Sequence, residues 1–140
     1  LKGTLLAGNA PGAVAAEGIE LKRIKSVEDL DREIAAAVAA KRPVMLDFYA
    51  DWCVSCKEME RFTLADPRVR TRLREATLLR VDVTDNRADA KRLLKRFDLF
   101  GPPGLVFFDA QGREMKHAQV VGYQPVERFL ATLQVALGNP

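Results

Sequence analysis

The apolar run VMLDFYA, residues 44–50, limits most strongly the folds that this chain of 140 residues can adopt. Such a run of strand-forming residues is typical of a central β-strand that is covered on both faces. Side chains alternate along a strand, so Val44, Leu46 and Phe48 share one face and Asp47 lies on the other. Because neither face of a central strand meets water, we expect the Asp47 carboxyl group to be buried.

The segments around this run alternate between strand and helix patterns. We expect further strands at 19–24, 77–83, 105–109 and 113–123, the last two joined as a hairpin. We expect helices at 26–43, 53–75 with a break near 66–67, 88–98 and 126–137. This order predicts an α/β fold whose central mixed sheet has a parallel core, an antiparallel edge hairpin and helices on both faces.

Two of these helices show their boundaries or faces directly. Ser26 and Asp29 form a capping box at the start of the first helix, and its apolar face is expected from Leu30, Ile34 and Val38. In the segment 88–98 the apolar residues fall at i, i+3, i+4 and i+7, which indicates an amphipathic helix; they are Ala90, Leu93, Leu94 and Phe97.

The first 18 residues differ from the rest in composition. They are rich in Gly and Ala and lack periodicity, so we expect a linker or flexible tail at 1–18 and one domain at 19–140. The chain starts with Leu1 rather than methionine, and we therefore expect a processed or excised piece.

Composition excludes several function classes. The 22 basic and 19 acidic residues are interspersed and leave a net charge of +3, so we expect no nucleic-acid binding. No apolar run approaches the roughly 20 residues of a membrane span. Two cysteines are too few for a disulfide scaffold or a four-cysteine zinc site. A Cys2His2 site would need a second histidine besides His117, to which we assign no role.

Both cysteines, Cys53 and Cys56, lie directly after the central strand, at the start of the next helix. The first N–H groups of a helix have no helical partner and its dipole is positive there, so a thiolate at Cys53 is favoured. Cys56 follows one turn later on nearly the same side, which brings the two sulfurs close enough to bond. Cys53 can therefore attack a partner's disulfide, and Cys56 can resolve the mixed disulfide.

Two carboxyl groups are expected beside these sulfurs. Glu60 lies four residues after Cys56 and hence on the same helix face, and Asp47 precedes the pair on the strand. Negative charge raises the pKa of a cysteine while the helix terminus lowers it, and the sequence leaves open which effect wins. We expect Asp47 or Glu60 to transfer protons to and from Cys56 as the mixed disulfide resolves.

The GPPG stretch at 101–104 predicts a fixed bend before a strand. If Pro103 follows a cis peptide bond, its loop can lie beside the cysteines. The carbonyl group of Pro102 would then face a bound partner strand, although Pro102 has no N–H to donate. Trp52 flanks Cys53 and fits either a partner surface or plain packing.

The stretch VMLDFYADWCVSCK, followed about fifty residues later by GPPGLVFF, resembles the thioredoxin superfamily. Within it, YADWCVSCKEMERFTLADPRV, LLRVDVT and LVFFDAQGRE are similar to the C-terminal periplasmic domain of the DsbD family of thiol:disulfide interchange proteins. The resemblance covers about residues 26–135.

This resemblance implies a thioredoxin fold and a protein-disulfide reductase with no bound cofactor, whose redox centre is the Cys53–Cys56 disulfide. It implies a periplasmic soluble domain of an inner-membrane protein, monomeric when excised. Such a domain takes electrons from the membrane-embedded domain of the same protein. It passes them to the N-terminal periplasmic domain of that protein, which reduces downstream partners.

The resemblance also implies the roles of the site residues. The catalytic residues would be Cys53 as nucleophile, Cys56 as resolving thiol, and Asp47 and Glu60 as carboxylates that tune the pair. The partner-binding residues would be Trp52, Pro102, the cis-proline Pro103 and Gly104. The chain departs from the family at Gly104, where Thr is common, and at Pro102, where another apolar residue is usual.

Four alternatives remain open at this point. The cysteines could form a merely structural disulfide, although a loop this short contributes little stability. They could bind copper or zinc as a metal carrier, although further ligands are missing. A stand-alone, membrane-anchored reductase serving cytochrome c maturation would share the motif. A non-catalytic binding module of the same fold would not need Cys53.

Overall fold

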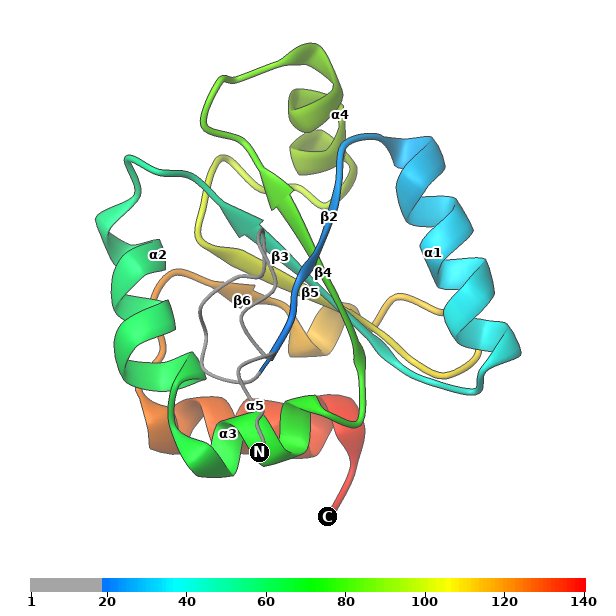
Figure 1. The fold of residues 1–140 in the computed structure, drawn as a ribbon, viewed down its shortest axis with the longest axis vertical. Helices are drawn as coiled ribbons and strands as arrows, with labels where there is room; N and C mark the ends of the chain where they lie inside the picture. The colour runs from blue at the N-terminus through cyan, green and yellow to red at the C-terminus, as the bar shows by residue number, and fades with distance from the viewer. Residues whose placement is uncertain (1–18) are drawn as a thin grey trace, which may run out of the picture.

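The computed structural model describes residues 19–140, and the linker expected at 1–18 lies outside the described residues. Within them, five strands form one sheet in the order β2-β4-β3-β5-β6 (Figure 1). Their bounds are β2 Lys22–Ile24, β3 Val44–Tyr49, β4 Thr77–Asp82, β5 Gly104–Phe108 and β6 Val120–Val121. As predicted, the run at 44–50 supplies the central strand, because β3 has neighbours on both sides.

The helices connect these strands and lie on both faces of the sheet (Figure 1). They are α1 Val27–Ala39, α2 Val54–Glu58, the π-helix η1 Met59–Leu64, α3 Pro67–Leu73, α4 Ala88–Arg96, the 3-10 helix η2 Lys116–Ala118 and α5 Val126–Leu137. The break predicted near 66–67 is confirmed, because Asp66 caps α3 and accepts a hydrogen bond from the Arg68 N–H. The predicted mixed sheet between two helical layers is confirmed.

The sheet changes direction at β5. Strands β2 and β3 run parallel to β4, whereas β5 runs antiparallel to β3 and β6 antiparallel to β5. The antiparallel part therefore begins one strand further inside the sheet than the predicted edge hairpin. Gly104, the first residue of β5, pairs with Phe48 near the end of β3. This pairing brings the GPPG loop next to the end of β3, which the segment with the two cysteines follows.

The second strand of the predicted hairpin, at 113–123, is mostly not a strand. Glu114 makes an isolated bridge to Phe108, η2 follows, and only Val120–Val121 pairs as β6. The reason is the spacing of Met115 and Ala118, which both pack on the core. Residues three apart lie on the same side of a 3-10 helix but on opposite sides of a strand.

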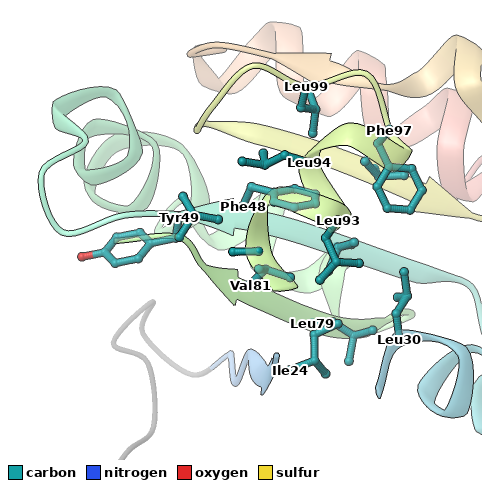
Figure 2. Close-up of a cluster of buried hydrophobic side chains, with 14 of the residues drawn as sticks. Ile24, Leu30, Phe48, Tyr49, Leu79, Val81, Leu93, Leu94, Phe97 and Leu99 are labelled. Atoms are coloured by element: carbon teal, nitrogen blue, oxygen red, sulfur yellow. The ribbon is translucent and has the colours of Figure 1, made fainter. Parts of the chain in front are cut away.

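Two apolar clusters hold the layers together. The first joins α1 and α4 to one face of the sheet and contains Leu30, Phe48 and the four apolar residues predicted for α4, all of them buried (Figure 2). The second joins η1, α3 and α5 to the other face and includes Met45, Phe107 and Phe129. The predicted placement of Val44, Leu46 and Phe48 on one face is thus confirmed, and Met45 packs on the other.

The start of α1 is as predicted, but its apolar face is shifted. The Ser26 Oγ accepts a hydrogen bond from the Asp29 N–H at 3.1 Å, while the Asp29 carboxylate accepts from the Lys25 N–H rather than from Ser26. Leu30 and Ala37 are the buried residues of α1, whereas Val38 is 38% exposed. Val38, which the sequence places on the apolar face, therefore lies at the rim of the layer, and Ala37 one position before it is buried instead.

Candidate active site

Cys53 is the residue that caps α2. Its Sγ accepts a hydrogen bond from the Cys56 N–H at 3.1 Å. The helix begins here because β3 ends at Tyr49, and the Cys53 N–H donates to the Ala50 carbonyl at 3.1 Å in a tight turn. The two cysteines form a disulfide, with Cα atoms 5.2 Å apart. One helical turn thus brings the sulfurs together, as the spacing predicts.

The two sulfurs have different surroundings although both residues are buried, at 5% and 4% exposure. Cys53 Sγ lies at the positive end of the helix and already accepts an N–H bond, which favours a thiolate there after reduction. Cys56 Sγ lies 3.9 Å from the Phe48 carbonyl oxygen, which can accept a hydrogen bond from the Cys56 thiol once the disulfide is reduced. The geometry therefore favours Cys53 as thiolate and Cys56 as thiol.

Asp47 and Glu60 meet at a buried arginine, Arg80. Asp47 Oδ2 accepts from Arg80 Nε at 2.8 Å and from Nη2 at 2.6 Å. Glu60 Oε2 lies 2.5 Å from the same Nη2 as an ion pair, without a hydrogen bond of favourable geometry. The pair forms because β3 and β4 are parallel neighbours whose register places Asp47 directly beside Arg80. The carboxyl group of Asp47 is buried, as predicted.

Asp47, Arg80 and Glu60, called the triad below, place two carboxyl groups around one guanidinium group. Burial raises the pKa of Asp47 above its ordinary 3.8, and the Arg80 guanidinium opposes this shift. Burial also disfavours the charge on Arg80, but the carboxylates of Asp47 and Glu60 outweigh it and raise the pKa of Arg80. The guanidinium also lies 4.2 Å from the centre of the Tyr49 ring, whose hydroxyl points away from the apolar cluster (Figure 2). Arg80 therefore stays charged and fixed.

A small cavity joins the triad to the resolving cysteine. It measures about 10 Å³, and its walls include Asp47, Cys56, Glu60, Arg80 and Pro103. This is about the space that one water molecule needs, and the polar groups around it are of the kind that retain a water. The carboxylates and Cys56 thus share one enclosed space.

The GPPG loop closes this space from the other side. The Pro102–Pro103 peptide bond is cis, as expected, and the Pro103 carbonyl accepts a hydrogen bond from the Gly122 N–H at 3.1 Å. Gly104 is buried against Leu99, because a Cβ at position 104 would lie 2.9 Å from Leu99 Cδ1. The side chain of Leu99 thus fills the space that a larger residue at 104 would need.

Trp52 lies at the rim of the site rather than in the core. Its side chain is among the exposed large apolar groups, with the residue 60% exposed, and its Nε1–H donates to the Thr84 carbonyl at 3.1 Å. The Asp51 N–H donates to the Thr84 hydroxyl at 2.8 Å. These two bonds hold the segment before Cys53 against the end of β4, with the indole face open.

The structure thus brings Cys53, Cys56, Asp47, Glu60 and Pro103 together around one cavity or its disulfide. It leaves Trp52 exposed and Pro102 half-buried nearby, and it buries Gly104 beneath the loop.

Arg80 is the site residue that the sequence analysis missed. The signal was present in TLLRVDV, where one arginine interrupts a central strand pattern just as Asp47 interrupts VMLDFYA. Two opposite charges in two neighbouring buried strands predict an ion pair.

Among residues 19–140, no group of three or more His, Cys, Asp or Glu side chains is placed to hold a metal ion. In the same part of the chain, every helix is too short or too polar to cross a membrane.

Comparison with known proteins agrees with this geometry. A family model described as a thioredoxin-like domain matches residues 30–137. The structure of the Neisseria meningitidis DsbD C-terminal domain, solved in oxidised and reduced forms, is 34% identical with a TM-score of 0.64. The match covers 77% of this chain and 96% of that domain. The chain belongs to the thioredoxin-like family and, within it, to the DsbD C-terminal domains.

Other relatives support this membership. DsbD of Ralstonia nicotianae is 57% identical over 124 residues, and DsbD of Salmonella paratyphi A is 44% identical over the same length. A thioredoxin of Thermus thermophilus is 30% identical with a TM-score of 0.63, covering 86% of this chain and 92% of that one. Each of these two DsbD matches covers 89% of this chain. The chain spans only about a fifth of the length of these curated DsbD relatives.

Family and site together define the chemistry in outline. DsbD proteins are thiol:disulfide interchange proteins, and this DsbD-type domain carries a close Cys53–Cys56 disulfide at a helix start. It is therefore a thiol–disulfide exchange domain.

Proposed function

We propose that this domain is a protein-disulfide reductase that relays electrons between two other thiol–disulfide domains of a larger protein. The observation that carries the proposal is the asymmetry of the disulfide. Cys53 Sγ lies at the helix start, whereas Cys56 faces the enclosed Asp47–Arg80–Glu60 triad. This arrangement makes Cys53 suited to attack a partner's disulfide and Cys56 suited to resolve the mixed disulfide.

The first step is the attack of the Cys53 thiolate on a partner's disulfide. A new S–S bond forms between Cys53 and the partner, the partner's own S–S bond breaks, and one partner sulfur leaves as a thiolate. The Cys56 N–H, 3.1 Å from Cys53 Sγ in the disulfide form, stabilises negative charge on that sulfur before the attack.

The second step is resolution by Cys56. Its thiol loses a proton, its thiolate attacks Cys53 Sγ, the Cys53–Cys56 bond forms again, and the second partner sulfur leaves as a thiolate. Asp47, whose pKa is raised by burial, is suited to accept the proton of Cys56 and to return it to the solvent or the partner. A water in the cavity of about 10 Å³ would connect the two groups. The partner gains two electrons and this domain loses two.

The partners follow from the DsbD family membership. We propose that electrons enter from a membrane-embedded domain and leave to an N-terminal domain, both of the same protein. The domain would then work in the periplasm, tethered to the inner membrane, without a bound cofactor. The chain's coverage of about a fifth of the DsbD relatives supports its place within a larger protein.

The reduction potential of the Cys53–Cys56 couple tests the direction of the relay. The protein would be equilibrated in defined thiol buffers and its free thiols counted by alkylation and mass spectrometry. A value of roughly −200 to −270 mV supports a reducing relay, and a value near −120 mV identifies an oxidant and overturns the proposed direction. In a parallel sample, Cys53→Ser should abolish the reduction of a protein disulfide, whereas retained activity would identify a non-catalytic module.

A further inference from the structure

A groove lies next to the active site, between α4 and the segment that leads into the GPPG loop. It has a volume of about 380 Å³ and will be called the α4 groove. Its lining residues are Asn86, Lys91, Leu94, Lys95, Asp98, Leu99 and Phe100. None of these residues belongs to the cavity beside Cys56.

The floor of the α4 groove is apolar. Leu94 and Leu99 are 9% and 6% exposed, and Figure 2 shows their side chains next to one another at the border of the core. Phe100 beside them is fully exposed, at 107%. A large aromatic side chain without any cover, at the edge of an apolar groove, is typical of a surface that contacts another molecule.

The rim of the α4 groove carries unpaired positive charge. Lys91 and Lys95 are four residues apart on α4 and so lie on the same face, where like charges destabilise a helix. Within the described chain, neither lysine forms an ion pair. By contrast, Arg92 and Arg96 of the same helix pair with Asp89 and Asp31. Asp98 supplies the only carboxylate among the lining residues, so the groove retains a net positive charge.

Residues that line the α4 groove are close to residues of the active-site surface. Leu99 packs against Gly104, and Phe100 stands two residues before Pro102. Asn86 follows Thr84 by two residues, and the Thr84 carbonyl accepts the hydrogen bond of the Trp52 side chain. The groove is therefore lined by the segments that continue from the GPPG loop and from the residue that holds Trp52.

We propose that the α4 groove binds an extended segment of the partner protein that carries a large apolar side chain flanked by carboxylates. The apolar side chain would occupy the space over Leu94 and Leu99 and contact Phe100. The carboxylates would pair with Lys91 and Lys95, which relieves the repulsion between these two ammonium groups. The proposal rests on the proposed function, because it assumes a protein as exchange partner, and it adds a recognition surface away from the sulfurs.

The test is a titration of the ¹⁵N-labelled 140-residue chain, in its disulfide form, with two short peptides. The probes are acetyl-Glu-Leu-Phe-Asp-amide and acetyl-Lys-Leu-Phe-Lys-amide. We expect the acidic peptide to shift the amide signals of α4 and of residues 98–100, with an affinity about tenfold higher than that of the basic peptide. The double variant K91E/K95E should reverse this preference. The control K25E/K116E changes the net charge by the same amount outside the groove. It should retain the preference for the acidic peptide.

Three results would overturn the proposal: equal affinities for the two peptides, shifts confined to other surfaces, and shifts that depend on protein concentration without peptide. The last would identify a second copy of the chain as the occupant. The variant spectra also show whether each protein is folded. Because peptide binding involves no thiol exchange, the result is independent of the reduction potential that tests the proposed function.

Discussion

Replacement of Arg80 by methionine should cost more stability than any change of a surface arginine. Arg80 is 2% exposed and is the cation that Asp47 and Glu60 share. The variant fills much of the same volume but leaves the buried Asp47 carboxyl group and the half-buried Glu60 carboxyl group without a counter-charge. Breaking a buried pair in this way typically costs about 3–5 kcal/mol. We expect a loss of this size in the free energy of unfolding at pH 7.

The loss should depend on pH with a defined sign. Burial raises the pKa of Asp47, and without Arg80 the opposing effect is gone, so this pKa rises further. The folded state then holds a proton that the unfolded state releases above its own pKa of 3.8. Stability therefore falls as pH rises from 3.8 to the folded pKa, by about 1.4 kcal/mol per pH unit for each such proton. The deficit should be small near pH 4 and largest at neutral pH.

Urea unfolding of the disulfide form at a series of pH values measures this deficit. The matched control is Arg23→Met, because Arg23 lies beside Arg80 in the sheet but makes an exposed ion pair with Asp82. We expect the control to lose about 1 kcal/mol or less at every pH. A deficit of Arg80→Met that is as large at pH 4 as at pH 7 would refute the electrostatic argument and leave only lost packing.

Three other changes have expected outcomes. Asp47→Asn should slow resolution of a mixed disulfide about a hundredfold or more, read from the lifetime of the adduct; an unchanged lifetime would exclude proton transfer by Asp47. Gly104→Thr should destabilise the protein by about 1–3 kcal/mol, because Leu99 occupies the space, and the added change Leu99→Ala should restore part of the loss in urea unfolding. If Gly104→Thr and the double variant lose the same free energy of unfolding, the contact with Leu99 is not the cause. Ser26→Ala should lower the unfolding free energy by about 1 kcal/mol through loss of the bond to the Asp29 N–H, and no change would show that solvent replaces this cap.

Much of the fold could be predicted because local patterns and tertiary contacts agree. The apolar run at 44–50 marks the central strand, the i, i+3, i+4 spacing marks α4, and Asp66-Pro67 marks the start of α3. The segment 113–123 could not be predicted in the same way. Its apolar residues fit a strand and a 3-10 turn about equally, and only packing on the core decides between them.

The candidate site was predictable as far as chain order determines it. The cysteines, Glu60 and the cis-proline follow from spacing within one helix and from one dipeptide. Arg80 lies 33 residues from Asp47, and their contact depends on which strands are neighbours and in what register. Such pairing is a property of the assembled sheet. It is therefore available from sequence only if buried charges in different strands are compared.

The two edges of the described sheet also affect how this domain behaves among other proteins. At one edge β2 is three residues long and carries Lys22 and Arg23, which pair with Glu33 and Asp82. At the other edge β6 has two residues and stops at Gly122. Both edge strands are short, and β2 also carries charged side chains, so they give a second sheet little to pair with. The proposed relay would bring this domain repeatedly against other folded domains, and these short edges limit strand exchange there. We expect the domain to resist fibril formation even when crowded.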